Sequence, residues 1–207
     1  MSPWKIPLSF VAISSVAFTA FAQQINTEFK ITKVESTLID SPMFSGVSYN
    51  KKTKAKPWLE VETTFEWTPP RQAQPSYTDE LTFTYYILLG NKSRQYPQGT
   101  LLVGSVTHTS IPPEKDLHSV VYVSPRALER FFDGKVPPSA QAVEAVGVTV
   151  TKQGQPVAEY SGKFQSQWWN KLNIPQTTGF VLNKNETPFA PLAWDYYEAI
   201  KPKSSGL

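Results

Sequence analysis

The sequence predicts an all-β fold: an immunoglobulin-like sandwich of two sheets, with one short helix and an aromatic-rich C-terminal tail. Three observations lead to this class. Short runs of alternating apolar and polar residues recur along the chain, and turns that contain proline or glycine separate many of them. Helical patterns do not alternate with these runs, as they would in a parallel α/β fold. The loops between the runs differ in length, which favours a two-sheet sandwich over a closed barrel.

The run over residues 80–90 predicts the central strand. Leu81, Phe83, Tyr85 and Ile87 share one face, and the polar alternation on the other face fades into apolar residues, as in a strand covered on both sides. The other predicted strands are residues 25–39, 57–67, 100–108, 117–123, 142–152 and 155–163.

Two of these strands carry further information. Residues 57–67 alternate most regularly, and Glu60, Glu62 and Glu66 lie on the polar face, which we expect to be solvated. Pro156 lacks a backbone N–H, so it predicts that the last strand lies at the edge of a sheet.

Two segments show helix signals. Ser124 is a favourable N-cap, Pro125 suits the first helical position, and apolar residues follow at helical spacing up to Phe132 before Asp133-Gly134 ends the helix. In the tail, Pro191 predicts the start of a second short helix over residues 191–201.

The chain divides into three parts by sequence character. Residues 1–22 predict a signal peptide, with Lys5, an apolar stretch over 6–18 and the small-residue cleavage site Ala20-Phe21-Ala22. Residues 23–163 form the predicted sandwich, and residues 164–207 the tail. We therefore expect an exported protein with no membrane span after cleavage, located in the periplasm, on the outer surface or outside the cell. The absence of cysteine excludes lipid attachment at a cleavage-site cysteine and favours a bacterial envelope.

No pattern for catalysis or cofactor binding stands out. The formal net charge of +3 gives no broad basic surface for nucleic acid. The serine-hydrolase motif G-x-S-x-G and glycine-rich phosphate loops are absent from the sequence. We therefore assign no catalytic residues, no metal ligands and no cofactors. A zinc site of His108, His118 and Asp116 would require the strands over 100–108 and 117–123 to pair as a hairpin.

The aromatic side chains of the tail are the candidate binding residues. They are Trp168, Trp169, Trp194, Tyr196 and Tyr197. In one interpretation the tail folds back over its own sandwich and covers an apolar surface. In the other it docks onto another subunit, because tryptophan and tyrosine are common interface anchors. In an extended segment, Trp168 and Trp169 would point to opposite sides.

Three functions follow from these interpretations. The first is a non-catalytic role in binding or assembly, with envelope or pilus-type proteins or a second copy of the chain as the partner. The second is a carbohydrate-binding module, in which Trp58, Trp67, Trp168 and Trp169 form a platform that stacks on a glycan. The third is a secreted hydrolase, for which pairs of carboxylates such as Glu60 and Glu62 are too common to be evidence.

The run Thr187-Pro-Phe-Ala-Pro-Leu-Ala-Trp-Asp-Tyr-Tyr-Glu198 resembles a C-terminal motif of secreted proteins in the Verrucomicrobia–Planctomycetes group. Within this group the chain is similar to an immunoglobulin-like protein family of the type IV pilus-like gene cluster of Akkermansia muciniphila. The resemblance implies an envelope or pilus-associated binding role without enzymatic activity. The chain differs from a pilin, because the residues that follow the predicted cleavage site, Gln-Gln-Ile-Asn-Thr-Glu-Phe, are polar.

Overall fold

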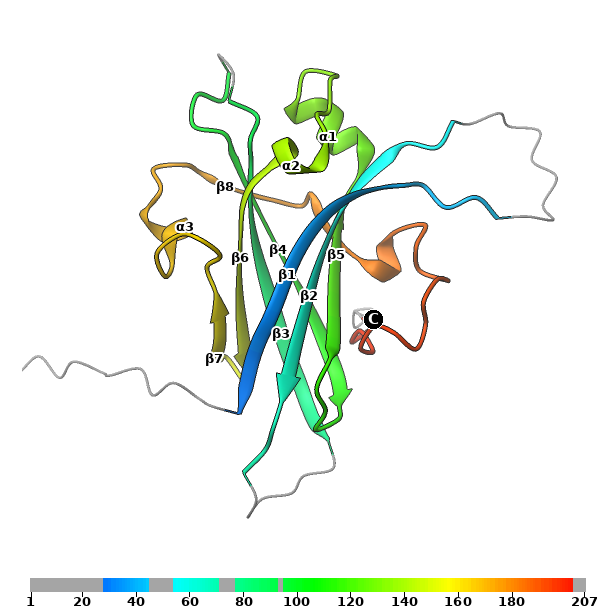
Figure 1. Ribbon diagram of the computed structural model, residues 1–207, viewed down its shortest axis with the longest axis vertical. Helices are drawn as coiled ribbons and strands as arrows, with labels where there is room; N and C mark the ends of the chain where they lie inside the picture. Colours follow the sequence, from blue (N-terminus) through cyan, green and yellow to red (C-terminus); the bar gives the residue numbers. More distant parts are fainter. Residues whose placement is uncertain (1–27, 45–53, 71–76, 93–94, 203–207) are drawn as a thin grey trace, which may run out of the picture.

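The protein folds as a sandwich of two β-sheets in a computed structural model that describes residues 28–44, 54–70, 77–92 and 95–202 (Figure 1). The first sheet has the order β1-β2-β5-β9, and the second has the order β7-β6-β3-β4-β8. The first sheet contains β1 (Phe29–Asp40), β2 (Pro57–Trp67), β5 (Leu117–Val123) and β9 (Val181–Asn183). The second contains β3 (Thr78–Leu89), β4 (Thr100–Ile111), β6 (Val143–Lys152), β7 (Gln155–Tyr160) and β8 (Gln176–Thr178). All pairs are antiparallel except β4 with β8.

The seven strands predicted from alternation are all present, although residues 25–27 of the first predicted strand lie outside the described residues. Strands β2 and β5 have the predicted bounds, and β3 lies at the centre of the second sheet, which confirms the prediction for residues 80–90. Strand β7, which contains Pro156, lies at the edge of the second sheet as predicted. The sequence did not predict β8 and β9, which contain three residues each.

The core lies between the inner faces of the two sheets. Each strand contributes every second residue, because side chains along a strand point alternately to its two faces. Phe65 from the first sheet and Phe83 from the second meet at the centre, with ring centroids 4.8 Å apart. Burial of each such side chain stabilises the fold by about 1.5–3 kcal/mol.

The predicted helix at Ser124 is confirmed as α1 (Pro125–Phe131). The Ser124 hydroxyl accepts a hydrogen bond from the Ala127 N–H at 3.3 Å, and Leu128 and Phe131 pack into the core. Two further one-turn helices, α2 (Ser139–Ala142) and α3 (Trp168–Lys171), and a 3-10 helix, η1 (Lys184–Glu186), were not predicted.

The helix predicted over residues 191–201 does not form. This segment consists of turns, and Ala193 has a φ of 48°, in the left-handed region that an α-helix cannot contain. Single turns replace the helix, as in the bond from the Leu192 N–H to the Phe189 carbonyl. The backbone N–H groups of Glu198 and Lys201 donate to the sandwich, at His118 in β5 and Thr107 in β4.

The tail covers one open side of the sandwich. Strand β8 extends the second sheet beside β4, and β9 extends the first sheet beside β5. Farther along, the hydrogen bonds of residues 198–201 join the same two edges. Both sheets therefore contain strands from before and after residue 163, the predicted boundary between the sandwich and the tail. The predicted signal peptide, residues 1–22, lies outside the described residues, and no helix within them is long and apolar enough to cross a membrane.

Candidate protein-binding surface

The first half of the tail packs on the outer face of the second sheet. Trp169 stacks on Tyr86 of β3, with ring centroids 4.5 Å apart and planes at 10°. Gly147 of β6 makes this contact feasible, because a Cβ atom there would lie 2.4 Å from the Trp169 ring. Trp168 and Trp169 are only 5% and 2% exposed.

These two predicted binding residues are therefore core residues, which excludes them as a surface platform in this conformation. They lie in the one-turn helix α3 and not in an extended segment, so they do not point to opposite sides of a strand. Trp67 is 1% exposed as well. Among the four tryptophans considered for glycan stacking, only Trp58 is half-buried, and its Nε1 donates to Ser41 Oγ at 3.1 Å.

The second half of the tail packs on the outer face of the first sheet. Phe189 stacks on Tyr122 of β5, with centroids 4.7 Å apart, and meets the edge of Trp58 in β2 at 5.7 Å. A capping box at η1 sets the direction of this segment. Asn183 Oδ1 accepts a hydrogen bond from the Asn185 N–H, and Glu186 Oε2 accepts one from the Asn183 N–H. The first sheet is thus covered on both faces at this position.

Glu62 of β2 connects the sheet to the tail. Its carboxylate accepts hydrogen bonds from Tyr196 at 2.9 Å, from Tyr197 at 3.1 Å and from His118 Nδ1 at 3.0 Å. Burial and the bond to Glu62 raise the pKa of Tyr196 to about 12, so its hydroxyl remains a donor at neutral pH. We expected the polar face of β2 to be solvated. This prediction is wrong at Glu62, because tyrosines of the tail cover its carboxylate.

Glu60, two residues earlier on the same face, has a related environment. Its Oε2 accepts from the Tyr122 hydroxyl at 3.0 Å. Burial raises the pKa of Glu60 above its usual range, although the bond from Tyr122 acts in the opposite direction. Burial also raises the pKa of Tyr197. Burial raises the pKa of Tyr122 as well, so Tyr122 and Tyr197 both remain protonated donors at neutral pH.

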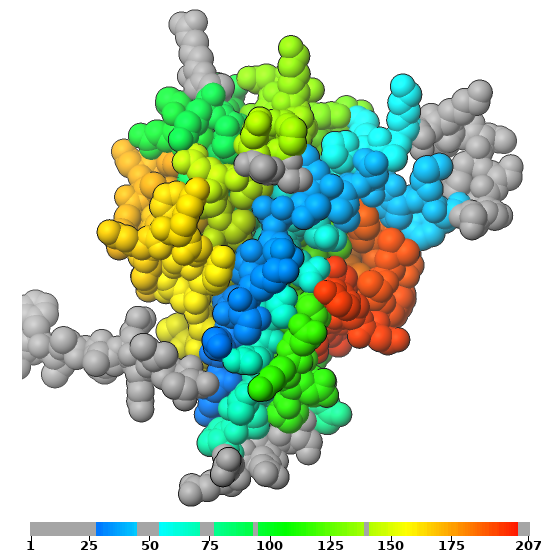
Figure 2. Space-filling model, viewed as in Figure 1, coloured from blue at the N-terminus to red at the C-terminus, as the bar shows by residue number. Residues whose placement is uncertain are grey.

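Among the described residues of the second half of the tail, three large apolar side chains are exposed, and we call them the tail surface: Leu192, Trp194 and Tyr196, at 38%, 74% and 48% exposure. The residue between the first two, Ala193, has the positive φ noted above, which sets the backbone direction at Trp194. The orange-red and red residues of the second half of the tail lie on the right flank of the sandwich, whereas the yellow and light-orange residues of its first half lie on the left (Figure 2). Of the five predicted binding residues, Trp194 and Tyr196 belong to this surface.

A buried lysine lies beneath the tail surface. Lys184 is 5% exposed, and its ammonium group donates to the Ala190 carbonyl at 3.0 Å. The same ammonium lies 6.0 Å from the Trp194 ring and 5.7 Å from the Tyr197 ring. Cation–π attraction therefore holds the inner side of the Trp194 indole while its outer side faces solvent. Sequence analysis missed Lys184 and Glu62, because their roles depend on contacts between distant segments.

The two histidines do not form the metal site considered from sequence. Strands β4 and β5 belong to different sheets, so they form no hairpin. His108 lies between the sheets, whereas His118 lies on the outer face, stacked on Tyr196 at 4.0 Å. Within the described residues, no three histidine, aspartate or glutamate side chains gather as metal ligands would.

His108 belongs to a closed hydrogen-bond chain. The Tyr85 hydroxyl donates to Ser119 Oγ at 2.9 Å, Ser119 Oγ lies 2.7 Å from His108 Nε2, and His108 Nδ1 lies 3.0 Å from the Glu198 carbonyl. Ser119 and His108 are adjacent, as in a nucleophile–base pair, but they are 0% and 1% exposed. No substrate can reach them in this conformation, and the chain instead fixes the end of the tail to the core.

Comparison with known proteins agrees with this architecture. A crystal structure of a protein from Akkermansia muciniphila superposes with a TM-score of 0.72 and 26% sequence identity, over 86% of this chain and 94% of that one. A search of curated proteins found no match. A family model matches residues 20–204. The chain therefore belongs to the family of proteins that resemble the pilus-cluster protein of Akkermansia muciniphila.

Proposed function

We propose that the protein is a non-catalytic, exported component of the bacterial envelope that binds another protein through its tail surface. The exposed indole of Trp194 is the observation that carries this proposal. A tryptophan that is 74% exposed loses the stabilisation that burial would give, and tryptophan is enriched among residues that dominate binding energy.

The anchoring of the tail supports this role. The residues around Trp194 are held by Phe189 on Tyr122, by Tyr197 on Glu62 and by Lys184 beneath the indole. A side chain presented from a fixed backbone loses less conformational freedom when it binds, so more of the contact energy contributes to affinity. The arrangement therefore favours a protein interface over a coat that only shields the sheet.

The rest of the proposal has its support in sequence and family. The predicted signal peptide over residues 1–22 and the resemblance to a pilus-cluster protein favour an envelope or pilus-type protein as the partner. Self-association is the alternative for the same surface. Ser119 and His108 are buried, so this pair cannot reach a substrate, which favours a binding role for the protein over a catalytic one.

Site-specific photo-cross-linking in the cell tests the proposal. A photoreactive phenylalanine analogue replaces Trp194 in one strain and Tyr77 in the control strain, since Tyr77 is also exposed, at 60%, and lies immediately before β3. We expect position 194, and not position 77, to cross-link to one envelope protein that mass spectrometry identifies.

Binding of the purified chain to that protein then gives the quantitative result. Trp194→Ala should weaken binding at least tenfold while leaving the unfolding midpoint unchanged. Equal cross-linking from both positions, or unchanged affinity of Trp194→Ala, would contradict the proposal. Cross-links between identical chains would assign the surface to self-association.

A further inference from the structure

The surroundings of the tail surface are acidic, although the chain as a whole carries a formal net charge of +3. Asp195 lies between Trp194 and Tyr196 in the sequence and is exposed. Asp116, in the loop before β5, is also exposed, with 82% of its side chain accessible. Within the described residues, neither aspartate pairs with a lysine or an arginine. Both carboxylates therefore leave negative charge without a basic partner beside the tail surface.

Two stacked rings connect Asp116 to Tyr196. The Asp116 carboxylate lies 3.6 Å from His118 Nε2, and the His118 ring stacks on the Tyr196 ring with centroids 4.0 Å apart. Burial and the bond to Glu62 raise the pKa of Tyr196 most, and the charges of Asp116 and Glu60 act in the same direction. The exposed part of the Tyr196 ring therefore lies in a negative electrostatic potential.

The lysines near the tail do not neutralise this potential. The ammonium group of Lys184 is buried beneath the tail surface and donates to a backbone carbonyl. Lys201 pairs with Glu80 of β3. Lys115, next to Asp116, is exposed and forms no ion pair within the part of the chain that the structure describes. The carboxylates around the tail surface therefore outnumber the unpaired lysines.

We propose that the tail surface binds a segment of another protein that carries an arginine, whose guanidinium group stacks on Tyr196 and pairs with Asp116. This inference rests on the proposed function and adds the chemistry of the partner. Arginine fits better than lysine, because its planar group stacks on aromatic rings and binds a carboxylate through two N–H groups. Lys184 already lies near the Trp194 indole, and like charges repel, so the cation belongs at Tyr196 while Trp194 contacts apolar residues.

A second copy of the chain is the less suitable occupant. The arginines among the described residues are Arg126 and Arg130. Arg126 donates to Glu129 at 2.9 Å, and the Arg130 guanidinium lies 5.8 Å from the Phe131 ring and 5.4 Å from the Phe180 ring. Both groups already have partners within their own chain, which favours a different protein as the source of the arginine.

NMR titration of the purified, ¹⁵N-labelled protein tests the proposal with three synthetic peptides. Each peptide has one variable residue between two leucines, with capped glycines at both ends. The variable residue is arginine, its neutral analogue citrulline, or glutamate. The arginine peptide should shift the signals of the Trp194 indole N–H and the Tyr196 amide, and these shifts should saturate. Its Kd should be about tenfold lower than that of the citrulline peptide, because citrulline forms neither the ion pair nor the cation–π contact.

Asp116→Asn and Asp133→Asn form a matched pair of variants. Both aspartates are exposed and both have a positive φ, of 65° and 49°, which asparagine tolerates. Asp133 lies in the turn after α1. Asp116→Asn should raise the Kd of the arginine peptide about threefold, as expected for a surface ion pair, and Asp133→Asn should leave it unchanged.

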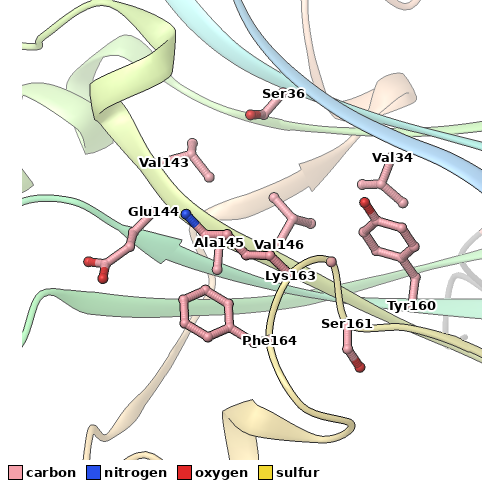
Figure 3. Close-up of a pocket in the computed structure, with 11 residues that line it drawn as sticks. Val34, Ser36, Val143, Glu144, Ala145, Val146, Tyr160, Ser161, Lys163 and Phe164 are labelled. Atoms are coloured by element: carbon pink, nitrogen blue, oxygen red, sulfur yellow. The ribbon is translucent and has the colours of Figure 1, made fainter.

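A hollow elsewhere on the protein supplies an internal reference for the same titration. It measures about 250 Å³, lies between β1 and β6, and is lined by Val146 and Phe164 among others (Figure 3). A peptide that adsorbs to apolar surface without selection would enter this hollow as well. The amide signals of Val146 and Phe164 should therefore stay in place while those of the tail surface move.

Several results would overturn the proposal. Equal Kd values for the arginine and citrulline peptides would show that the contact is only apolar. A lower Kd for the glutamate peptide, or no saturable shift with the arginine peptide, would exclude a basic partner. Equal weakening by Asp116→Asn and Asp133→Asn would assign the effect to overall charge, and equal shifts at Val146 would indicate adsorption.

The proposed function is judged separately, by the photo-cross-linking at position 194. A captured envelope protein that binds wild type and Asp116→Asn equally well would refute the arginine contact and leave the proposed function intact. Binding of the arginine peptide without any protein cross-linked in the cell would contradict the proposed function and leave the chemistry of the surface as inferred.

Discussion

The buried chain at His108 predicts a specific loss of stability in acid. Burial lowers the pKa of His108 from its ordinary value of 6.5 to about 4 in the folded protein, against the opposing effect of its bonds to the backbone at Glu198 and Ala199. Protonation of the folded state would also break the bond that His108 Nε2 accepts from Ser119. The folded protein therefore holds this histidine neutral, whereas the unfolded chain binds a proton near pH 6.5.

The sign and size of the effect follow from this difference. The folded pKa is below the unfolded pKa, so the unfolded state binds more protons between them, and stability falls as the pH falls. The contribution is complete above about pH 6.5 and is lost towards pH 4. Each pKa unit between the two states corresponds to about 1.4 kcal/mol. His108 should therefore account for a loss of about 3 kcal/mol between pH 7 and pH 4.

Urea unfolding followed by tryptophan fluorescence measures this loss at pH 7, 6, 5 and 4. Other groups titrate in this range, and burial raises the pKa of Glu60 and of Glu198, which acts in the opposite direction. The comparison is therefore between wild type and His108→Gln, which keeps a donor and an acceptor but does not titrate. The difference in unfolding free energy between the two proteins should change by about 3 kcal/mol from pH 7 to pH 4.

The other histidine supplies the control. His118→Gln removes the bond to Glu62 on the outer face but leaves the buried chain of Tyr85, Ser119 and His108 intact. It should retain the part of the pH dependence that comes from His108. Parallel pH profiles for wild type and His108→Gln would refute the argument, because they would mean that the histidine binds protons equally in both states.

Three further predictions concern the tail and its carboxylates. Trp169→Ala should lower the unfolding free energy by about 3–5 kcal/mol, whereas Trp194→Ala should change it by less than about 0.5 kcal/mol, as measured by urea unfolding. Glu62→Gln leaves at least one tyrosine hydroxyl without its charged acceptor and should cost about 1.5–3 kcal/mol in the same assay. Glu60→Gln should stabilise the protein at pH 7 and lose this advantage in acid, because the raised pKa of Glu60 makes its ionised form costly when folded; a variant that is less stable at pH 7 would contradict this.

Strand prediction succeeded where alternation reports burial directly. In β2 and β3 the inner residues are mostly apolar and their neighbours mostly polar, so periodicity alone located both strands and the central position of β3. Strands β8 and β9 are too short for a period to appear. Their positions depend on close approach to β4 and β5, and a Cβ at Gly104 would lie 2.5 Å from Val181. A sequence pattern does not record such a contact.

The candidate site was predictable only in part. Trp194 and Tyr196 were selected by residue type, and they are exposed. Trp168 and Trp169 were selected by the same criterion and are buried, because the difference depends on Gly147 and Tyr86 in other strands. Residue type identifies side chains able to anchor an interface, whereas tertiary packing decides which of them remain available.

This division within the tail determines how its function can be tested. Phe189 and Tyr197 cover Tyr122 and Glu62, so deletion of the tail would expose an apolar face and remove the two tyrosine donors of Glu62. Loss of binding by a truncated chain could then reflect misfolding alone. Trp194 is largely exposed to solvent and contributes little to the stability of the fold. Substitution of this residue therefore tests binding without changing stability. The tail surface is therefore best understood as an exposed edge of the folded domain rather than an independent docking peptide.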